Sequence, residues 1–189
     1  MRELWLMRHG ETAWSLSGAH TGKTDVALTA RGEDQARAVR SQLQSQTFAA
    51  VLTSPLTRAR ETCRLAGLAD NARVCDDLRE WDYGDFEGRT SQQIRVDYPD
   101  WSIWTGPVPG GERIEQVAAR ARRALELAGA YDGPVAVFAH GHILRVLAAC
   151  WLGLSPDSGK LFGLSTGSVS LLGYEHETRV LSRWNQVPA

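Results

Sequence analysis

Two short segments of this chain place histidine directly after an apolar run, in an arrangement that could do chemistry. They are Arg8-His9-Gly10-Glu11-Thr12 and His140-Gly141-His142. Histidine changes charge near neutral pH and can act as a base or a nucleophile, and glycine lets a ligand approach the backbone closely. Either histidine alone could equally be a hydrogen-bonded loop residue. Two at equivalent positions, one beside an arginine, favour a functional site.

The apolar runs before these segments are expected to position the two histidines. Residues 4–7 read as a short buried strand, and residues 134–139 read as a central buried strand after Asp132-Gly133. Ligand sites in open α/β sheets lie beyond the carboxyl ends of the strands. If these two strands are neighbours, His9 and His140 therefore face each other at that edge.

The rest of the chain alternates short apolar runs with helical periodicity, which predicts an α/β fold. Further strands are expected at 49–53, 73–75, 168–174 and 179–184, and helices at 29–44, 112–128 and 142–152. Ser54-Pro55 is interpreted as an N-cap followed by a proline at the first helical position, with a buried stripe of Leu56, Ala59, Cys63 and Ala66. Residues 76–111 are the least regular and are expected to form a loop-rich insertion over one edge of the sheet.

Composition limits the classes of function. The chain has 189 residues, with 22 acidic and 21 basic groups and a net charge of −1, which argues against nucleic acid or an anionic membrane as a partner. A small anion site remains compatible with this balance. Three widely spaced cysteines, Cys63, Cys75 and Cys150, indicate free thiols in a reducing compartment. Without a signal peptide or membrane span, residues 1–189 are expected to be one cytoplasmic domain.

Several blocks, taken together and in order, resemble the histidine phosphatase superfamily, also called the phosphoglycerate mutase-like family. The resemblance begins at the Arg-His-Gly motif and covers nearly the whole chain. The blocks are Arg8-His9-Gly10-Glu11-Thr12, His20-Thr21-Gly22, Leu28-Thr29-Ala30-Arg31-Gly32, Ser54-Pro55-Leu56-Thr57-Arg58-Ala59, Glu80-Trp81-Asp82-Tyr83-Gly84-Asp85-Phe86-Glu87-Gly88 and His140-Gly141-His142. It implies a three-layer sandwich with a mostly parallel central sheet, helices on both faces and a small cap at about residues 88–111.

The resemblance also implies a division of roles among side chains. His9 matches the nucleophile that takes up the phosphoryl group, and a neutral imidazole can do this near pH 7. Arg8, Arg58 and His140 match the phosphate pocket, with His140 also counted as catalytic. Glu80 matches the general acid, and nearby phosphate oxygens should help its carboxyl group to stay protonated. No metal and no cofactor are expected.

Three further positions are expected to contact substrate. Thr21 and Gly22 match a pair that lends backbone N–H groups and a hydroxyl group. Ser15 stands where many members have asparagine, so its contact with phosphate is either lost or bridged by water.

The remaining polar residues receive more ordinary interpretations. His20 is expected at the entrance of the site, and His176 on a surface strand or turn. His142 and Arg145 are interpreted as supporting or structural residues, and Arg60 and Arg64 as surface charges. Trp101 and Trp104 pack the core or lid, or alternatively form an apolar wall for the organic part of the substrate.

The function predicted from the sequence is a metal-independent phosphomonoesterase that acts through a phosphohistidine on small phosphorylated metabolites. Acid phosphatases and sugar-bisphosphate phosphatases, such as sedoheptulose bisphosphatase, are the most similar members. The alternatives are a phosphoglycerate mutase and a non-catalytic domain that binds a phosphorylated ligand. A homodimer is compatible with the sequence.

Overall fold

A computed structural model describes residues 3–188 as one six-stranded sheet with helices on both faces. The predicted strands and helices are present, with ends within a few residues of expectation. The strands are β1 (Leu4–Arg8), β2 (Ala50–Thr53), β3 (Ala72–Val74), β4 (Val135–Ala139), β5 (Val169–Glu175) and β6 (Thr178–Gln186). The helices are α1 (Ala13–Ser17), α2 (Ala30–Leu43), α3 (Thr57–Leu65), α4 (Ser91–Asp97), α5 (Ile114–Gly129) and α6 (Gly141–Trp151).

The strand order brings the two histidine-bearing strands together. The order is β3-β2-β4-β1-β5-β6, in which β1, β2, β3 and β4 run parallel and the β1–β5 and β5–β6 pairs are antiparallel. In the β1–β4 pair, Arg8 lies opposite Ala139. His9 and His140 are therefore the first residues beyond two neighbouring parallel strands, as the sequence predicts.

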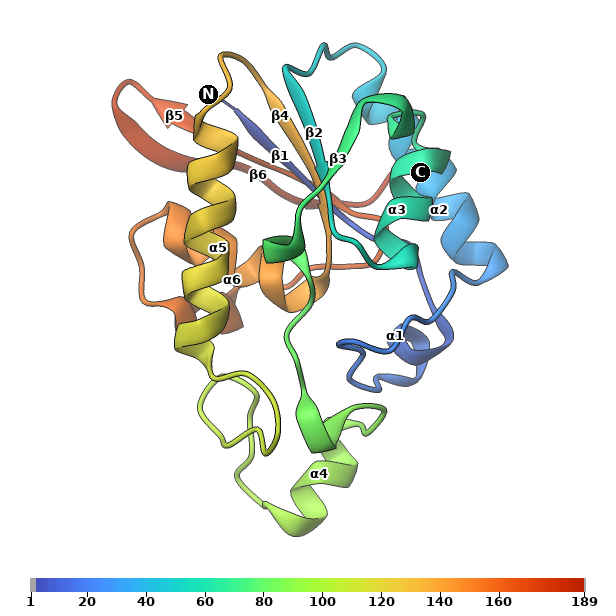
Figure 1. Ribbon diagram of the computed structural model, residues 1–189, viewed down its shortest axis with the longest axis vertical. Coiled ribbons are helices and arrows are strands. Elements are labelled where there is room, and N and C mark those ends of the chain that lie inside the picture. Colours follow the sequence, from blue (N-terminus) through green and yellow to red (C-terminus); the bar gives the residue numbers. More distant parts are fainter. Residues whose placement is uncertain (1–2, 189) are drawn as a thin grey trace.

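The strands are apolar throughout because both faces of the sheet are covered. Leu4 and Leu6 of β1 pack into the core formed with α5 and α6, whereas Trp5 and Met7 pack into the core formed with α2 and α3. Alternate residues of a strand point to opposite faces, so one apolar run fills both layers. Figure 1 shows α5 and α6 on one side of the sheet and α2 and α3 on the other, which confirms the three-layer sandwich.

The prediction that Ser54 caps α3, with Pro55 as its first residue, is wrong. The helix begins at Thr57, after Leu56, and Ser54 continues the extended chain by donating its N–H to the Phe138 carbonyl. The Ser54 hydroxyl is hydrogen-bonded to His140 and accepts the N–H of Leu56, the residue before the helix, and it bonds no amide of the first helical turn. The carboxylate of Asp25 caps the helix, since it accepts the Thr57 N–H at 2.9 Å and the Thr57 hydroxyl at 2.5 Å.

The segment expected as a loop-rich cap contains a short helix. A capping box of Thr90 and Gln93 begins α4, which lies far from the sheet at the lower end of Figure 1. Trp101 and Trp104 are both buried in the main core, and the Trp101 indole N–H donates to the Pro107 carbonyl. This packing matches the core or lid interpretation of these two residues.

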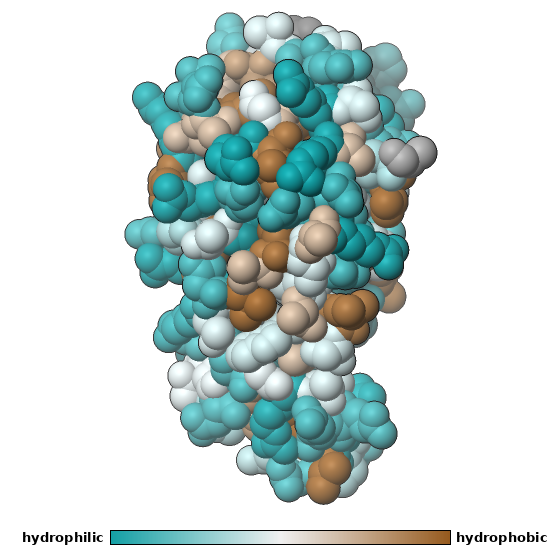
Figure 2. Space-filling view, turned by 90° about the vertical axis from the view of Figure 1, so that its right-hand side faces the viewer, coloured by the Kyte–Doolittle hydropathy of each residue, from teal (hydrophilic) through white to brown (hydrophobic). Residues whose placement is uncertain are grey.

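The surface that covers α2 and α3 is mainly hydrophilic. In Figure 2, apolar residues are scattered among hydrophilic ones, and the cap forms the narrower lower end of the molecule. Within residues 3–188, no helix has the length and apolar character required to cross a membrane. Cys63, Cys75 and Cys150 are all free thiols.

Candidate active site

A pocket of about 160 Å³ opens where the parallel strands end. It lies among the ends of β1 and β4, the beginning of α6 and the segment after α1. Most of its lining residues have polar side chains, and Glu80 is the one carboxyl group among the described lining residues. The lining residues are Arg8, His9, Ser15, Gly18, Ala19, His20, Thr21, Glu80, Tyr83, Gly141, His142, Arg145 and Leu164.

His9 is buried at the base of this pocket in a defined tautomer. Its Nδ1 lies 2.7 Å from the Gly10 carbonyl oxygen, which can only accept, so Nδ1 carries the proton. The other ring nitrogen, Nε2, then keeps its lone pair. Burial, together with the charges of Arg8 and Arg58, lowers the pKa of His9 well below its ordinary value. The ring is therefore neutral near pH 7 and can act as a nucleophile.

His140 lies beside His9, with ring centroids 5.2 Å apart, but both of its nitrogens are engaged by protein groups. Nδ1 accepts from Arg58 Nε at 3.1 Å, and Nε2 lies 2.7 Å from the Ser54 hydroxyl oxygen. Because Arg58 can only donate, the proton of the His140 ring is on Nε2, and Nε2–H donates a hydrogen bond to the Ser54 hydroxyl oxygen. Burial and the neighbouring Arg58 charge lower the pKa of His140. In this arrangement His140 supports Arg58, and its direct contact with phosphate stays a prediction.

Arg58 is completely buried and is held from several sides. Its Nη1 donates to the Thr24 carbonyl at 2.9 Å, and its Nη2 donates to the carbonyls of Thr21 and Gly22 at 3.0 and 2.9 Å. The positive charge thus lies beside His9 and His140 without facing the pocket. These bonds and the one to His140 use four of the five N–H groups of Arg58, and its binding of phosphate remains a prediction.

Arg8 reaches the pocket with part of its hydrogen-bonding capacity unused. Its Nη1 donates to the Leu164 carbonyl, whereas its Nε is buried and has no partner. A Cβ atom at Gly141 would lie 3.3 Å from Arg8 Cζ, so this glycine leaves room for the guanidinium group. A half-buried guanidinium group with a buried, unpartnered N–H suits an anionic ligand.

The two glycines after the histidines differ in their surroundings. A Cβ atom at Gly10 would lie only 2.1 Å from the Gly32 carbonyl oxygen, so Gly10 permits a close approach between two protein segments instead of the expected approach to a ligand. Gly141 lines the pocket beside Arg8, and close approach of a ligand to its backbone stays a prediction.

Glu80 is nearly buried and lies at the N-terminus of α6. Its Oε2 accepts the His142 N–H, and its Oε1 accepts the N–H groups of Ile143 and Trp81, each at 2.9 Å. These bonds satisfy free amides of the first helical turn and fix the carboxyl group at the pocket wall. An acid held this firmly has a defined position relative to a bound substrate.

The three residues expected to contact substrate differ in what they have free. Ser15 and Thr21 line the pocket, but the Ser15 hydroxyl exchanges hydrogen bonds with the Thr12 backbone, and the Thr21 hydroxyl donates to the Ala19 carbonyl. The Gly22 N–H donates to Glu87 at 2.8 Å. Their contacts with substrate therefore stay predictions.

A group of rings on the pocket wall is richer than the sequence indicated. The Tyr83 hydroxyl and His142 Nδ1 share a hydrogen bond of 2.6 Å, and the His20 ring lies 4.7 Å from that of Tyr83. Tyr83 lies three positions after Glu80 in one of the blocks that resemble the family. This closeness in sequence to Glu80 is the feature that could have indicated a place for Tyr83 in the site. His20 lines the pocket as expected, and His176 lies on the exposed turn between β5 and β6.

The charge around the pocket is carried by protein side chains. Arg8 and Arg145 line it, and Arg58 lies behind His9. Across residues 3–188, no three histidine, cysteine, aspartate or glutamate side chains gather in a group that could hold a metal ion. The geometry suits a dianionic group placed against a neutral imidazole, with one carboxyl group at its side.

Comparisons with known proteins agree with this geometry. A family model described as the histidine phosphatase superfamily (branch 1) matches residues 4–187. An acid phosphatase of Mycobacterium tuberculosis is 42% identical over 95% of this chain and 90% of its own length. A sedoheptulose 1,7-bisphosphatase of Saccharomyces cerevisiae is 37% identical over 79% and 67%, respectively. A solved structure from a Mycobacterium tuberculosis open reading frame superposes with a TM-score of 0.91, at 40% identity and 98% coverage of both chains.

Proposed function

Because the chain belongs to the histidine phosphatase superfamily, we propose that it is a phosphomonoesterase that acts through a phosphohistidine on His9. The observation that carries this proposal is the hydrogen bond from His9 Nδ1–H to the Gly10 carbonyl. It leaves Nε2 unprotonated, with its lone pair available, at the base of the pocket. That nitrogen attacks phosphorus while the bond to the ester oxygen breaks. The negative charge on the phosphoryl oxygens is met by Arg8 and, behind His9, by Arg58.

Glu80 is the proposed acid for the departing oxygen. It lines the same pocket as His9, and the other described lining residues include no carboxyl group. After it has given its proton to the leaving alcohol, the carboxylate takes a proton from the water that attacks the phosphohistidine. This second displacement releases phosphate and returns His9 and Glu80 to their starting states.

Small phosphorylated metabolites, including sugar phosphates, are the proposed substrates. The names of the relatives support this class, because one is an acid phosphatase and another acts on sedoheptulose 1,7-bisphosphate. A pocket of about 160 Å³ suits a phosphoryl group with a small organic part. A panel of phosphate esters assayed for released phosphate, with specificity constants, orders the candidates.

A metal ion has no place in the proposed steps. The positive charge is supplied by guanidinium groups, and the nucleophile is an imidazole rather than a metal-bound water. We expect dialysis against a chelator to leave phosphate release unchanged. Activity that disappears on dialysis and returns only with a divalent cation would contradict this part of the proposal.

Replacement of His9 tests the central step. We expect His9→Ala to lower turnover by about three orders of magnitude or more, because the nucleophile is lost. Rapid quenching of the unaltered protein with labelled substrate should trap acid-labile phosphate on the chain, and the variant should trap none. The matched control is His176→Ala on the exposed β5–β6 turn, which should behave as the unaltered protein. Near-normal activity in His9→Ala would overturn the proposal.

A further inference from the structure

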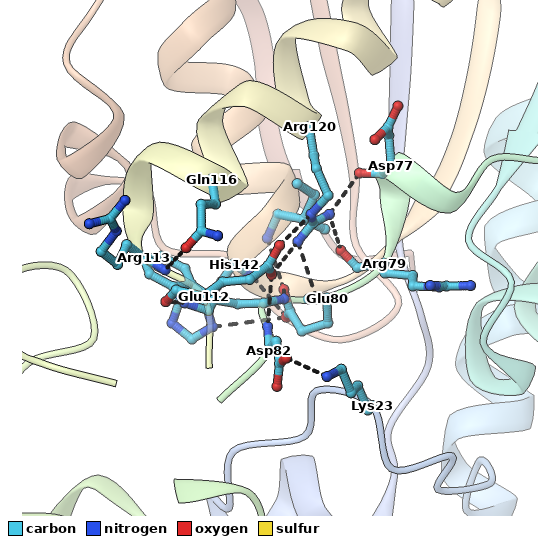
Figure 3. Close-up of polar contacts among 12 residues, drawn as sticks. Lys23, Asp77, Arg79, Glu80, Asp82, Glu112, Arg113, Gln116, Arg120 and His142 are labelled. Carbon is cyan, nitrogen blue, oxygen red and sulfur yellow. Dashed lines mark hydrogen bonds and ion pairs between the residues drawn. The ribbon is translucent and has the colours of Figure 1, made fainter. Parts of the chain in front are cut away.

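The side chain of Arg120 donates hydrogen bonds to the backbone of the irregular segment that carries Glu80. It extends from α5, and Figure 3 shows it pointing into the space between Asp77 and Glu112. Its Nη1 donates to the carbonyls of Asp77 and Arg79 at 2.8 and 2.9 Å, and its Nη2 donates to the Glu80 carbonyl at 3.4 Å. The segment from Arg79 to Tyr83 has no regular secondary structure, so these carbonyls depend on partners of this kind.

A paired carboxylate fixes the orientation of Arg120. Glu112 accepts from Arg120 Nε at 2.8 Å and from Nη2 at 2.7 Å, in the two-pronged geometry that suits a guanidinium group. Together with the three carbonyls, this accounts for all five N–H groups of Arg120. Both side chains are largely buried, with 13% and 20% of the side-chain surface exposed.

Glu112 also binds the segment on the far side of Glu80. Its Oε2 accepts the Asp82 N–H at 3.0 Å, its carbonyl accepts the Trp81 indole N–H at 2.8 Å, and its own N–H donates to the Asp82 carbonyl. The pair therefore holds the backbone both before and after the proposed acid.

We infer that Arg120 is a positioning residue for Glu80: with Glu112, it fixes the backbone of residues 77–82 and so sets where the Glu80 carboxyl group meets the substrate. The inference rests on the proposed function of Glu80. Proton transfer depends steeply on position, and a displacement of about 1 Å can cost a hundredfold in rate. His9 directly follows β1 and is not held by this pair, so the attacking group keeps its place when Arg120 is changed.

Two substrates that share a ring separate this role from a general loss of structure. Phenyl phosphate has a basic leaving group that needs a proton, whereas 4-nitrophenyl phosphate has a good leaving group that needs little protonation. The readout is the ratio of the two turnover numbers in one preparation, which does not depend on the fraction of protein that is folded.

We expect Arg120→Met to lower turnover of phenyl phosphate roughly ten- to a hundredfold relative to 4-nitrophenyl phosphate. Arg120→Lys keeps a charge but loses the forked geometry, and should recover part of the ratio. The matched control is Arg123→Met, which removes an exposed pair with the Asp77 carboxylate and touches none of the three carbonyls. It should leave the ratio unchanged.

Glu80→Gln supplies the comparison that keeps this inference separate from the proposed function. Glu80→Gln should shift the ratio in the same direction and further, and addition of Arg120→Met to it should shift the ratio no more. If Glu80→Gln changes the ratio and Arg120→Met lowers both substrates equally, the inference on Arg120 is overturned and the acid stands. If Glu80→Gln leaves the ratio unchanged, the acid assignment and the inference fail together.

Discussion

Four histidines border or lie next to the pocket, and burial favours the neutral form of each. The pKa values of His9, His140 and His142 are all lowered, with loss of solvent as the main cause and nearby arginine charges as the second. Burial lowers the pKa of His20 to about 4. For His9 the result serves the proposed chemistry directly, since protonation at Nε2 would remove the attacking lone pair.

The lowered pKa of His20 makes folding stability depend on pH. The unfolded chain takes up this proton near pH 6.5 and the folded protein only near 4, so the free energy of unfolding falls as the pH drops between these values. At pH 5 the titration of His20 should lower the free energy of unfolding by about 2 kcal/mol relative to its value at neutral pH. Urea unfolding at pH 7.5 and pH 5 should show a smaller difference for His20→Gln than for the unaltered protein. An equal difference in both proteins would contradict the prediction.

At the scale of elements, α3 depends on a residue from a distant loop. Asp25 caps its first turn, and the same loop supplies the carbonyls that hold Arg58, which is the second residue of the helix. This loop therefore fixes the position of Arg58 in two ways. It caps the helix that carries Arg58, and it accepts hydrogen bonds from the Arg58 guanidinium group.

Removal of this cap should weaken the protein by an amount typical of helix N-caps. We expect Asp25→Ala to lower the free energy of unfolding by about 1 kcal/mol. The control, Asp34→Ala, removes an exposed pair with Arg37 on α2 and should change it by less than about 0.5 kcal/mol. Denaturant unfolding of the three proteins measures both effects, and equal changes in the two variants would remove the special role of Asp25.

At the scale of the whole molecule, the small cap bears on what accepts the phosphoryl group. A mutase must retain a sugar-acid intermediate and exclude water while the intermediate reorients. The two basic residues between Gly88 and Gly111 are used within the cap: Arg89 donates to the Gln93 carbonyl and to Asp97, and Arg95 donates to the Trp101 carbonyl. Neither lines the pocket, so neither is placed to grip a substrate carboxylate.

We therefore expect hydrolysis to exceed phosphoryl return. An enzyme-coupled assay should show little interconversion of 3- and 2-phosphoglycerate, with or without a bisphosphoglycerate primer, alongside phosphate release from several esters. The two rates are compared on one preparation. Mutase turnover well above phosphate release would favour the alternative while leaving the roles of His9 and Arg58 intact.

The sequence alone determined the layers and the neighbourhood of the site. Apolar runs of strand length, helical periodicity and the polar residues directly after β1 and β4 are local features, so they predict elements and the edge where His9 and His140 meet. The matched blocks added the family and the candidate roles of Arg58 and Glu80.

The tertiary structure alone decided which partners these side chains have. The hydrogen bonds from Arg58 to the carbonyls of Thr21, Gly22 and Thr24 span more than thirty positions, and those from Arg120 to the Glu80 segment span about forty. Periodicity and turn chemistry act over a few residues. A guanidinium group finds its acceptors only after the loops have packed, because that packing brings distant carbonyls together and removes the water that would otherwise satisfy them.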